Sequence, residues 1–161
     1  MTASEDIFGR NEDMIFVSHY DSPLGMIYMA ADDDVLKGVW FEGQKYFASG
    51  LDKKETEDKE TPVLKQTKEW LDLYFAGKEP EFLPPLAPEG SEFQKKVWKI
   101  LLMIPYGKTM TYGEIGRKVA EMSGKKTMSA QAVGGAVGHN PISILIPCHR
   151  VVGTNGSLRS E

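Results

Sequence analysis

The sequence contains little cysteine and histidine: one cysteine, Cys148, and three histidines among 161 residues. A single cysteine cannot form a disulfide within the chain, and a cysteine-rich zinc site needs several thiolates. The histidines, His19, His139 and His149, are widely spaced along the chain. We therefore expect no metal site.

Long apolar runs are also missing, since no stretch reaches the roughly 18 residues that a membrane span needs. The first residues, MTASEDIFGRNED, are acidic and lack the apolar core of a secretory signal. Together with the lone cysteine, these absences favour a reducing compartment inside the cell. We expect a cytoplasmic protein that works away from membranes.

Charge is unevenly distributed along the chain. Residues 1–88 hold 18 Asp and Glu against 9 Lys and Arg, a net charge of −9, whereas residues 89–161 hold 5 against 10, a net charge of +5. A basic C-terminal half can contact the phosphates of a nucleic acid even in a chain that is acidic overall. Uneven charge is also common on solvated surfaces, so charge alone leaves both interpretations open.

The first half of the sequence has the pattern of a small α/β unit. Residues 14–20, 25–31 and 35–41 are rich in β-branched and aromatic residues and are separated by turn-forming residues, which predicts three strands. The almost fully charged stretch 51–60 is expected to be a solvated loop. A helix is then expected to begin at Thr61, with Pro62 in its first turn, and to end near Gly77.

The proline-rich stretch 81–90 is interpreted as a linker, because it holds three prolines and a glycine and coincides with the change in charge. It divides the chain into two expected domains, residues 1–88 and 89–161. We find no internal repeat.

The second half is expected to be mainly helical. Ser91 with Gln94, and Thr111 with Glu114, have the spacing of capping boxes that begin helices. Ser129 is expected to cap a third helix, AQAVGGAVG. The last two helices form a helix-turn-helix pattern. The small residues of the third helix allow close approach either of DNA or of the helix behind it, and the sequence leaves both open.

The segment ISILIPCHRVVG, residues 142–153, carries the reactive groups. Its apolar run is expected to be a buried strand that leads to Cys148. A lone buried cysteine is usually inert packing. Here His149 can accept the thiol proton, directly or through water, and Arg150 adds positive charge or anchors the segment, so the thiol is a candidate nucleophile.

The motif Pro-Cys-His-Arg-Val at residues 147–151 resembles the active-site signature of the O6-alkylguanine-DNA alkyltransferases. SAQAVGGAVGHNPISILIPCHRVVG, residues 129–153, resembles the family's recognition helix, asparagine hinge and active-site strand in unbroken order. FQKKVWKILLMIPYGKTMTYGEIG, residues 93–116, and DSPLGMIYMA, residues 21–30, resemble segments upstream. The resemblance extends over most of residues 14–157.

This resemblance implies a fold and an activity. The fold is α/β, with a small ribonuclease-H-like N-terminal α/β domain built on an antiparallel sheet, and a mainly helical C-terminal helix-turn-helix domain that is winged-helix-like. Cys148 is implied as the acceptor of the alkyl group, in a single turnover without a cofactor. His149 is implied as the base that draws off the thiol proton through water, and Asn140 as the hinge that holds the local backbone and the thiol region.

The same resemblance implies that the damaged nucleotide is rotated out of the DNA stack, because the thiol cannot otherwise align behind the alkyl carbon. Tyr112 is implied to contact the DNA backbone and to assist this rotation. The remaining implied DNA-binding residues are Gln131, Ala130, Gly134 and Arg150. The implied residues of the base pocket are Val151, Ser143 and Pro147. The partner is double-stranded DNA that contains alkylated guanine, and we expect a monomer with no obligate protein partner.

The sequence departs from the family pattern at three places. Gln131 stands where many members carry an arginine, so we expect base flipping with weaker or altered DNA affinity. Ser143 stands where some members carry a proline that packs on benzyl inhibitors, and we expect a poor response to these compounds. Members continue after the Asn155-Gly156 turn into a glycine-rich loop, a tyrosine and a helix with a glutamate that orients the histidine. Without a counterpart of that segment, we expect reduced activity.

Three other functions remain as alternatives. A lesion-binding protein that only flags alkylated bases is the nearest, but such proteins replace the cysteine. A helix-turn-helix regulator does not explain the apolar run before Cys148. A cysteine hydrolase could use Cys148 and His149, but no motif that would stabilise an oxyanion accompanies them.

Overall fold

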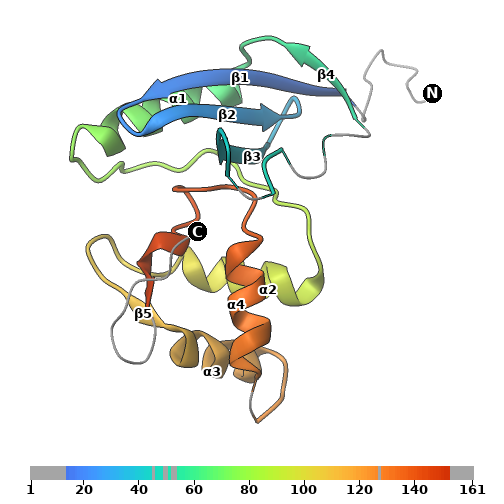
Figure 1. The fold of residues 1–161 in the computed structure, drawn as a ribbon, viewed down its shortest axis with the longest axis vertical. Helices are drawn as coiled ribbons and strands as arrows, with labels where there is room; N and C mark the ends of the chain where they lie inside the picture. Colours follow the sequence, from blue (N-terminus) through green and yellow to red (C-terminus); the bar gives the residue numbers. More distant parts are fainter. Residues whose placement is uncertain (1–13, 45, 49–50, 52–53, 127, 153–161) are drawn as a thin grey trace.

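A computed structural model of the chain describes residues 14–44, 46–48, 51, 54–126 and 128–152. In Figure 1 a sheet with one helix forms the upper part of the molecule, and a group of helices forms the lower part. Among the described residues, no helix has the length and apolar character that a membrane span requires.

The N-terminal sheet is built from β1 (Met14–Ser22), β2 (Gly25–Ala31), β3 (Leu36–Phe41) and β4 (Glu55–Asp58), in the order β3-β2-β1-β4. The first three strands pair antiparallel, as the sequence predicted, and β4 joins β1 in parallel. The sheet is therefore mixed. The prediction of a loop across residues 51–60 was wrong where β4 forms. All four β4 side chains are exposed, so this edge strand pairs through its backbone and has no apolar alternation to reveal it.

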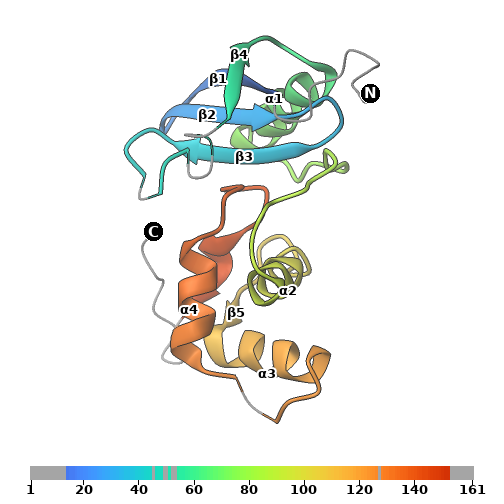
Figure 2. The same ribbon diagram turned by 90° about the vertical axis from the view of Figure 1, so that its right-hand side faces the viewer.

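Helix α1 (Pro62–Phe75) packs against β1 and β2, on one side of the sheet (Figure 2). The Thr61 hydroxyl accepts a hydrogen bond from the backbone N–H of Leu64 at 3.3 Å, so the helix begins where the sequence predicted. After the helix the chain turns at Gly77, whose φ of +80° is a conformation that glycine adopts without a steric penalty.

An extended segment leads from α1 to the C-terminal helices, and Leu86 within it bridges to Leu36 of β3. The helices are α2 (Glu92–Leu101), α3 (Tyr112–Met122) and α4 (Ala130–Gly138). Both predicted capping boxes are present at the starts of α2 and α3, and the Ser129 hydroxyl caps α4. The helix-turn-helix predicted from these caps is therefore confirmed as α3 and α4.

Helix α2 supports both members of the helix-turn-helix. The indole N–H of Trp98 donates to the carbonyl oxygen of Ala136 on α4 at 2.8 Å, and the Lys96 ammonium donates to the Ser123 hydroxyl after α3 at 3.1 Å. These bonds, together with apolar packing, fix α3 and α4 relative to one another.

The apolar run before Cys148 is buried as expected, but it does not form the expected strand. The chain forms a tight turn there, in which Ile144 has a φ of 71°, followed by a short 3₁₀ helix, η1 (Cys148–Arg150). Only β6 (Val151–Val152) is extended, and it pairs in parallel with β5 (Met110–Thr111). The apolar run is buried on all sides, and a buried turn has the same continuous apolar pattern as a buried strand.

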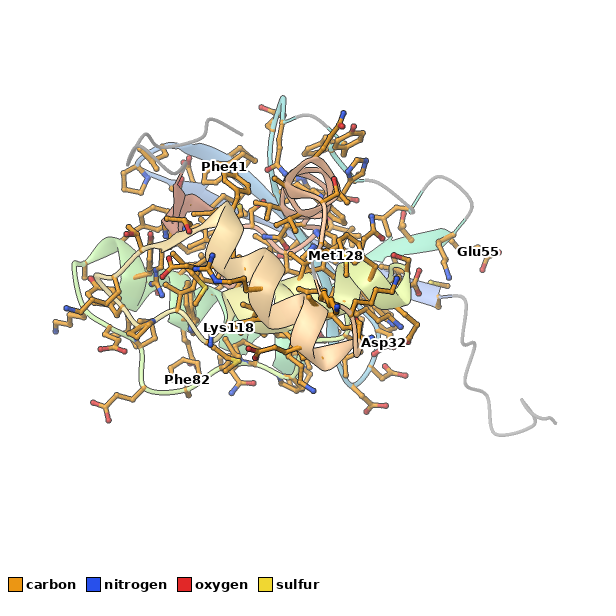
Figure 3. All side chains as sticks on the ribbon, turned by 90° about the horizontal axis from the view of Figure 1, so that it is seen from below. Asp32, Phe41, Glu55, Phe82, Lys118 and Met128 are labelled. Carbon is orange, nitrogen blue, oxygen red and sulfur yellow. The ribbon has the colours of Figure 1, made fainter. Side chains whose placement is uncertain are left out.

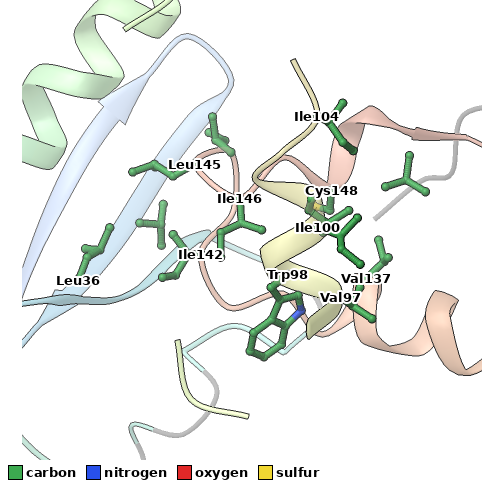
Figure 4. Packing of buried hydrophobic residues seen from close by; sticks show 14 of the residues in the cluster. Leu36, Val97, Trp98, Ile100, Ile104, Val137, Ile142, Leu145, Ile146 and Cys148 are labelled. Atoms are coloured by element: carbon green, nitrogen blue, oxygen red, sulfur yellow. The ribbon is translucent and has the colours of Figure 1, made fainter. Parts of the chain in front are cut away.

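The two halves of the chain share one apolar core. A single cluster contains Leu36 and Leu71 from the N-terminal half and Val97, Ile142 and Cys148 from the C-terminal half. Figure 4 shows Ile142, Leu145 and Ile146 between the sheet and α2. The segment that leads to the cysteine is therefore packed against both halves.

Candidate active site and DNA-binding surface

The 3₁₀ turn η1 separates three neighbouring side chains. A 3₁₀ helix has three residues per turn, so consecutive side chains leave the axis about 120° apart. Cys148 points into the core, where it is 3% exposed and lies near Ile100 and Ile146 in Figure 4. His149 points to solvent on the side of α1, and Arg150 points to the turn after α2. The thiol and the imidazole are thus adjacent in the chain but occupy different surroundings.

His149 meets a residue of the N-terminal half. Its Nε2 lies 3.2 Å from the hydroxyl oxygen of Tyr74, near the end of α1. Partial desolvation lowers the pKa of His149, and the neighbouring Arg150 guanidinium lowers this pKa further. The imidazole is therefore neutral at pH 7 and able to accept a proton.

Arg150 anchors the turn to the rest of the C-terminal domain. Its guanidinium donates to the carbonyl oxygen of Ile104 at 2.9 Å and lies over the ring of Tyr106, 5.5 Å from the ring centroid. Of the two roles that the sequence allowed, these contacts correspond to the anchor. They hold η1 against the end of α2 and keep a positive charge beside the imidazole.

Asn140 holds the turn before Cys148 from inside. Its amide nitrogen donates to the carbonyl oxygen of Ile146 at 2.8 Å, and its amide oxygen accepts from the backbone N–H of Ile142 at 3.0 Å. The side chain is 4% exposed, so both bonds satisfy polar groups that water reaches poorly. This geometry corresponds to the hinge that the family resemblance implied.

Strand β3 also holds this turn through its backbone. Val39 donates to the carbonyl oxygen of Pro141 at 2.8 Å and accepts from the backbone N–H of Ser143 at 2.9 Å. The Ser143 hydroxyl donates to the amide oxygen of Gln44 at 3.1 Å, in the loop after β3. The N-terminal sheet therefore extends onto the segment that carries the cysteine.

A cavity of about 610 Å³ opens beside His149. Both halves of the chain contribute to its wall, which includes Phe41, Gln44, Tyr74, Ser143 and His149. Of the three predicted pocket residues, only Ser143 belongs to this wall. Pro147 lines a second cavity of about 370 Å³, whose wall shares Tyr74 and Ile144 with the first. Val151 is buried in β6, 1% exposed.

Sequence reasoning missed the residues that the N-terminal half contributes to this cavity. These residues, Phe41, Gln44 and Tyr74, lie far before Cys148 in the sequence. No sequence motif links them to the cysteine. Tyr74 lies within the helix predicted after Thr61, and a tyrosine in a helix is as compatible with packing as with function.

The surface of the helix-turn-helix lies at the end of the molecule that faces away from the sheet. Figure 3 views this end, with Lys118 of α3 and Met128 of the turn before α4 labelled. Ala130 and Gln131, at the start of α4, are exposed. Tyr112 is partly buried at the start of α3, close to Gly134.

The described residues do not crowd Gly134, Gly135 and Gly138 of α4. A Cβ atom built on Gly134 would lie 3.9 Å from the Tyr112 ring, an ordinary contact, and one built on Gly135 or Gly138 would meet no atom of the described residues within 4 Å. Packing against the described residues therefore does not require glycine at these positions.

The other histidines have local surroundings. His139 ends α4, where its Nδ1 lies 2.8 Å from the carbonyl oxygen of Gly135 and its ring stacks on Tyr46. His19 packs edge-on against Tyr28. Within the described ranges, no three His, Cys, Asp or Glu side chains come together in a group that could hold a metal ion.

Comparison with known families gives this site a context. Residues 92–161 match the model described as the DNA-binding domain of 6-O-methylguanine DNA methyltransferase, and residues 15–88 match the model of its ribonuclease-like domain. The chain belongs to this family. The family assignment and the expected α/β plus helical fold are thereby confirmed, and so is the expected enzyme class, a DNA-repair methyltransferase that uses a protein cysteine.

Relatives resemble the chain over most of its length. A methylated-DNA–protein-cysteine methyltransferase of Methanosarcina acetivorans is 41% identical over 145 residues, which cover 89% of this chain and 87% of the relative. The protein of the same name from Mycolicibacterium paratuberculosis is also 41% identical, over 90% of this chain and 82% of its own.

Solved structures extend the likeness to three dimensions. A crystal structure of Mycobacterium tuberculosis OGT in complex with DNA has a TM-score of 0.74 and 36% identity, and it covers 92% of this chain and 83% of its own. A structure of the Mycobacterium tuberculosis O6-methylguanine methyltransferase has a TM-score of 0.75 and 39% identity, over 91% and 84% of the two chains. The match of residues 92–161 to the family's DNA-binding domain supports DNA binding by the present chain.

Proposed function

We propose that this chain removes the alkyl group from O6-alkylguanine in double-stranded DNA and keeps it on Cys148. The observation that carries the proposal is the 3₁₀ turn η1, in which consecutive residues carry a buried thiol and a partly desolvated imidazole in the same domain as a helix-turn-helix. The proposed organisation has residues 1–88 as a supporting domain and residues 89–161 as the domain that binds DNA and reacts. The proposed location is the cytoplasm, and no obligate protein partner is required.

Delivery of the damaged base is assigned to the helix-turn-helix. The exposed start of α4, with Ala130 and Gln131, enters the DNA groove, where recognition helices make their base contacts. Gly134 lets the DNA approach the helix closely. Tyr112 contacts the backbone and assists rotation of the nucleotide out of the stack. Gln131 then hydrogen-bonds the base that loses its partner.

The chemical step is one displacement. His149 takes the proton of the Cys148 thiol through a water molecule, and the sulfur attacks the O6-alkyl carbon. The carbon–oxygen bond breaks, its electron pair goes to O6, and the guanine regains a proton at N1. A thioether and an unmodified guanine result, so the equation balances without a cofactor. Because a thioether is stable, each molecule reacts once.

Charge and shape at the site support these roles. The lowered pKa of His149 keeps the imidazole neutral and ready to take a proton, and Asn140 fixes the turn that carries the thiol. A protein that only flags lesions has no need of the thiol, so that alternative is not favoured.

Stoichiometry tests the proposal directly. The protein is mixed with an excess of duplex DNA that carries one O6-methylguanine, and the repaired guanine is counted over time. The expected result is a plateau at one guanine per protein molecule. Continued turnover would contradict the single-use mechanism, and binding without any repair would support the lesion-flagging alternative. A second reaction, with a duplex that carries O4-methylthymine, shows whether the protein also repairs alkylated thymine.

A further inference from the structure

The N-terminal domain contacts His149, the residue proposed to accept the thiol proton, through Tyr74. Its hydroxyl oxygen and the Nε2 of His149 are 3.2 Å apart, although the two residues are 75 positions apart in the sequence. We propose that Tyr74 is a positioning residue of the transfer reaction, which holds the His149 ring so that Nδ1 handles the thiol proton. The inference rests on the proposed function, because it assigns a role within that reaction.

Tyr74 is itself held in place by aromatic neighbours. Its ring stacks on Trp70, with the centroids 5.3 Å apart and the planes 11° apart, and it meets Phe75 edge-on at 5.4 Å. Trp70 is buried, so the stack ties Tyr74 to the core beneath α1. A hydroxyl fixed on a helix orients its partner more tightly than one on a loop does.

The contact persists when His149 changes its protonation state. Burial raises the pKa of Tyr74, against a smaller opposing effect of Arg150, so the phenol keeps its proton and can both donate and accept. The neutral His149 tautomer that can take a proton at Nδ1 carries its hydrogen on Nε2, and it donates that hydrogen to the phenol oxygen. Once His149 is protonated, Nε2 carries a hydrogen and donates to the phenol oxygen. Tyr74 therefore steadies the ring before and after it takes the thiol proton.

The hydrogen bond also affects the charge of His149. A bond from an imidazolium is stronger than a bond between neutral groups, so Tyr74 favours the protonated ring. Burial and Arg150, its neighbour in η1, act in the opposite direction. Two further groups face this region: Tyr106, whose interaction is with Tyr74, and Glu42, which lines the cavity beside His149.

The test compares Tyr74→Phe with Tyr20→Phe. The first removes only the hydroxyl that meets His149. The second is a matched control, because it removes a hydroxyl that bonds to Asp72 of the same helix at 2.6 Å and does not line the cavity. Single-turnover transfer from O6-methylguanine DNA is measured against pH, and the His149 ring is titrated by NMR without DNA.

The expected result for Tyr74→Phe is a transfer rate about three- to tenfold lower, the usual range for one lost hydrogen bond. The His149 titration and the acid limb of the rate profile should both move to lower pH, whereas Tyr20→Phe should match the unmodified protein in both. A slower rate with an unmoved titration, or no change in either, would overturn the inference. Absence of transfer by the unmodified protein would instead contradict the proposed function, while the NMR titration still tests the Tyr74 contact.

Discussion

At the scale of single residues, the turn at 148–150 assigns three adjacent side chains to three tasks. Cys148 is buried with the core, His149 reaches α1, and Arg150 bonds to the carbonyl of Ile104. This separation follows from the 120° step of a 3₁₀ helix. In a strand, Cys148 and Arg150 would have shared one face, and the guanidinium would have replaced part of the apolar packing around the thiol.

Asn140 is the residue whose loss should affect the turn most. Asn140→Ala leaves the buried N–H of Ile142 without its partner, at a cost of about 1–3 kcal/mol. The variant also removes one of two hydrogen bonds to the carbonyl oxygen of Ile146, which still accepts from the backbone N–H of Cys148 at 2.8 Å. We expect a lower midpoint of thermal unfolding and a slower transfer reaction.

The matched control for this variant is Asp32→Ala. It removes a carboxylate that also accepts two local backbone hydrogen bonds, in the turn between β2 and β3, and Asp32 does not line the cavity beside His149. It should lower stability but leave the transfer rate unchanged for the folded protein. Equal transfer by Asn140→Ala and the unmodified protein would show that the hinge does not position the thiol.

The acid side of the pH profile should report His149. Desolvation first, and then Arg150, lower the pKa of its imidazole, so the neutral base persists below its ordinary pKa of about 6.5. We expect the single-turnover rate to hold steady through neutral pH and to fall only when the pH passes below that ordinary value. A fall centred above it would contradict the role of a neutral His149.

At the scale of secondary structure, α4 combines poor helix formers with an exposed face. Ala130, Gln131 and Gly135 are exposed, while Val133 and Val137 pack on the core. Glycine in a helix costs roughly 1 kcal/mol relative to alanine. The described residues do not crowd Gly134, Gly135 or Gly138, so packing against them does not offset this loss of helix stability.

Gly134→Ala tests whether DNA is what requires the glycine. The added methyl meets Tyr112 at an ordinary distance, so stability should rise by up to about 1 kcal/mol. Affinity for duplex DNA, measured by fluorescence anisotropy, should fall because the methyl group occupies the surface that approaches the backbone.

Gly138→Ala is the control for that variant, because it lies in the same helix at the end away from the expected groove contact. Its affinity for DNA should remain that of the unmodified protein. Unchanged affinity in Gly134→Ala would show that the small residues of α4 serve neither DNA approach nor packing.

The helices could be predicted from the sequence because each begins at a capping residue that a short local pattern identifies. Thr61, Ser91, Thr111 and Ser129 each cap a helix in the structure at the predicted position. Strand β4 could not be predicted, because its pairing with β1 involves backbone groups and leaves its charged side chains in water. The turn at 142–147 could not be predicted either, because its side chains are buried on every side. Such burial removes the alternation of apolar and polar residues that distinguishes a strand from a turn.

At the scale of the whole molecule, the two halves are joined by one core and by β3. Val39 bonds on both sides of Ile142, so the edge of the N-terminal sheet supports the reactive segment directly. Contacts of this kind connect residues about a hundred positions apart. The sequence contains no local signal for them, which is why it predicted Cys148 and His149 but not Tyr74 or Gln44.

The shared core predicts that both halves unfold together. Calorimetry should give one thermal transition, with equal calorimetric and van't Hoff enthalpies. Leu71→Ala, a buried change in α1 that costs about 2–5 kcal/mol, should lower the midpoint of that one transition. Two separate transitions, only one of which moves in the variant, would show instead that the halves are independent.

The most direct test of the central claim is the mass of the protein after reaction with a duplex that contains one O6-methylguanine, compared with a Cys148→Ala variant. We predict a gain of one methyl group, located on Cys148 by peptide mapping and absent from the variant. A protein that binds the damaged duplex but gains no mass, or that carries the methyl group on another residue, would contradict the account.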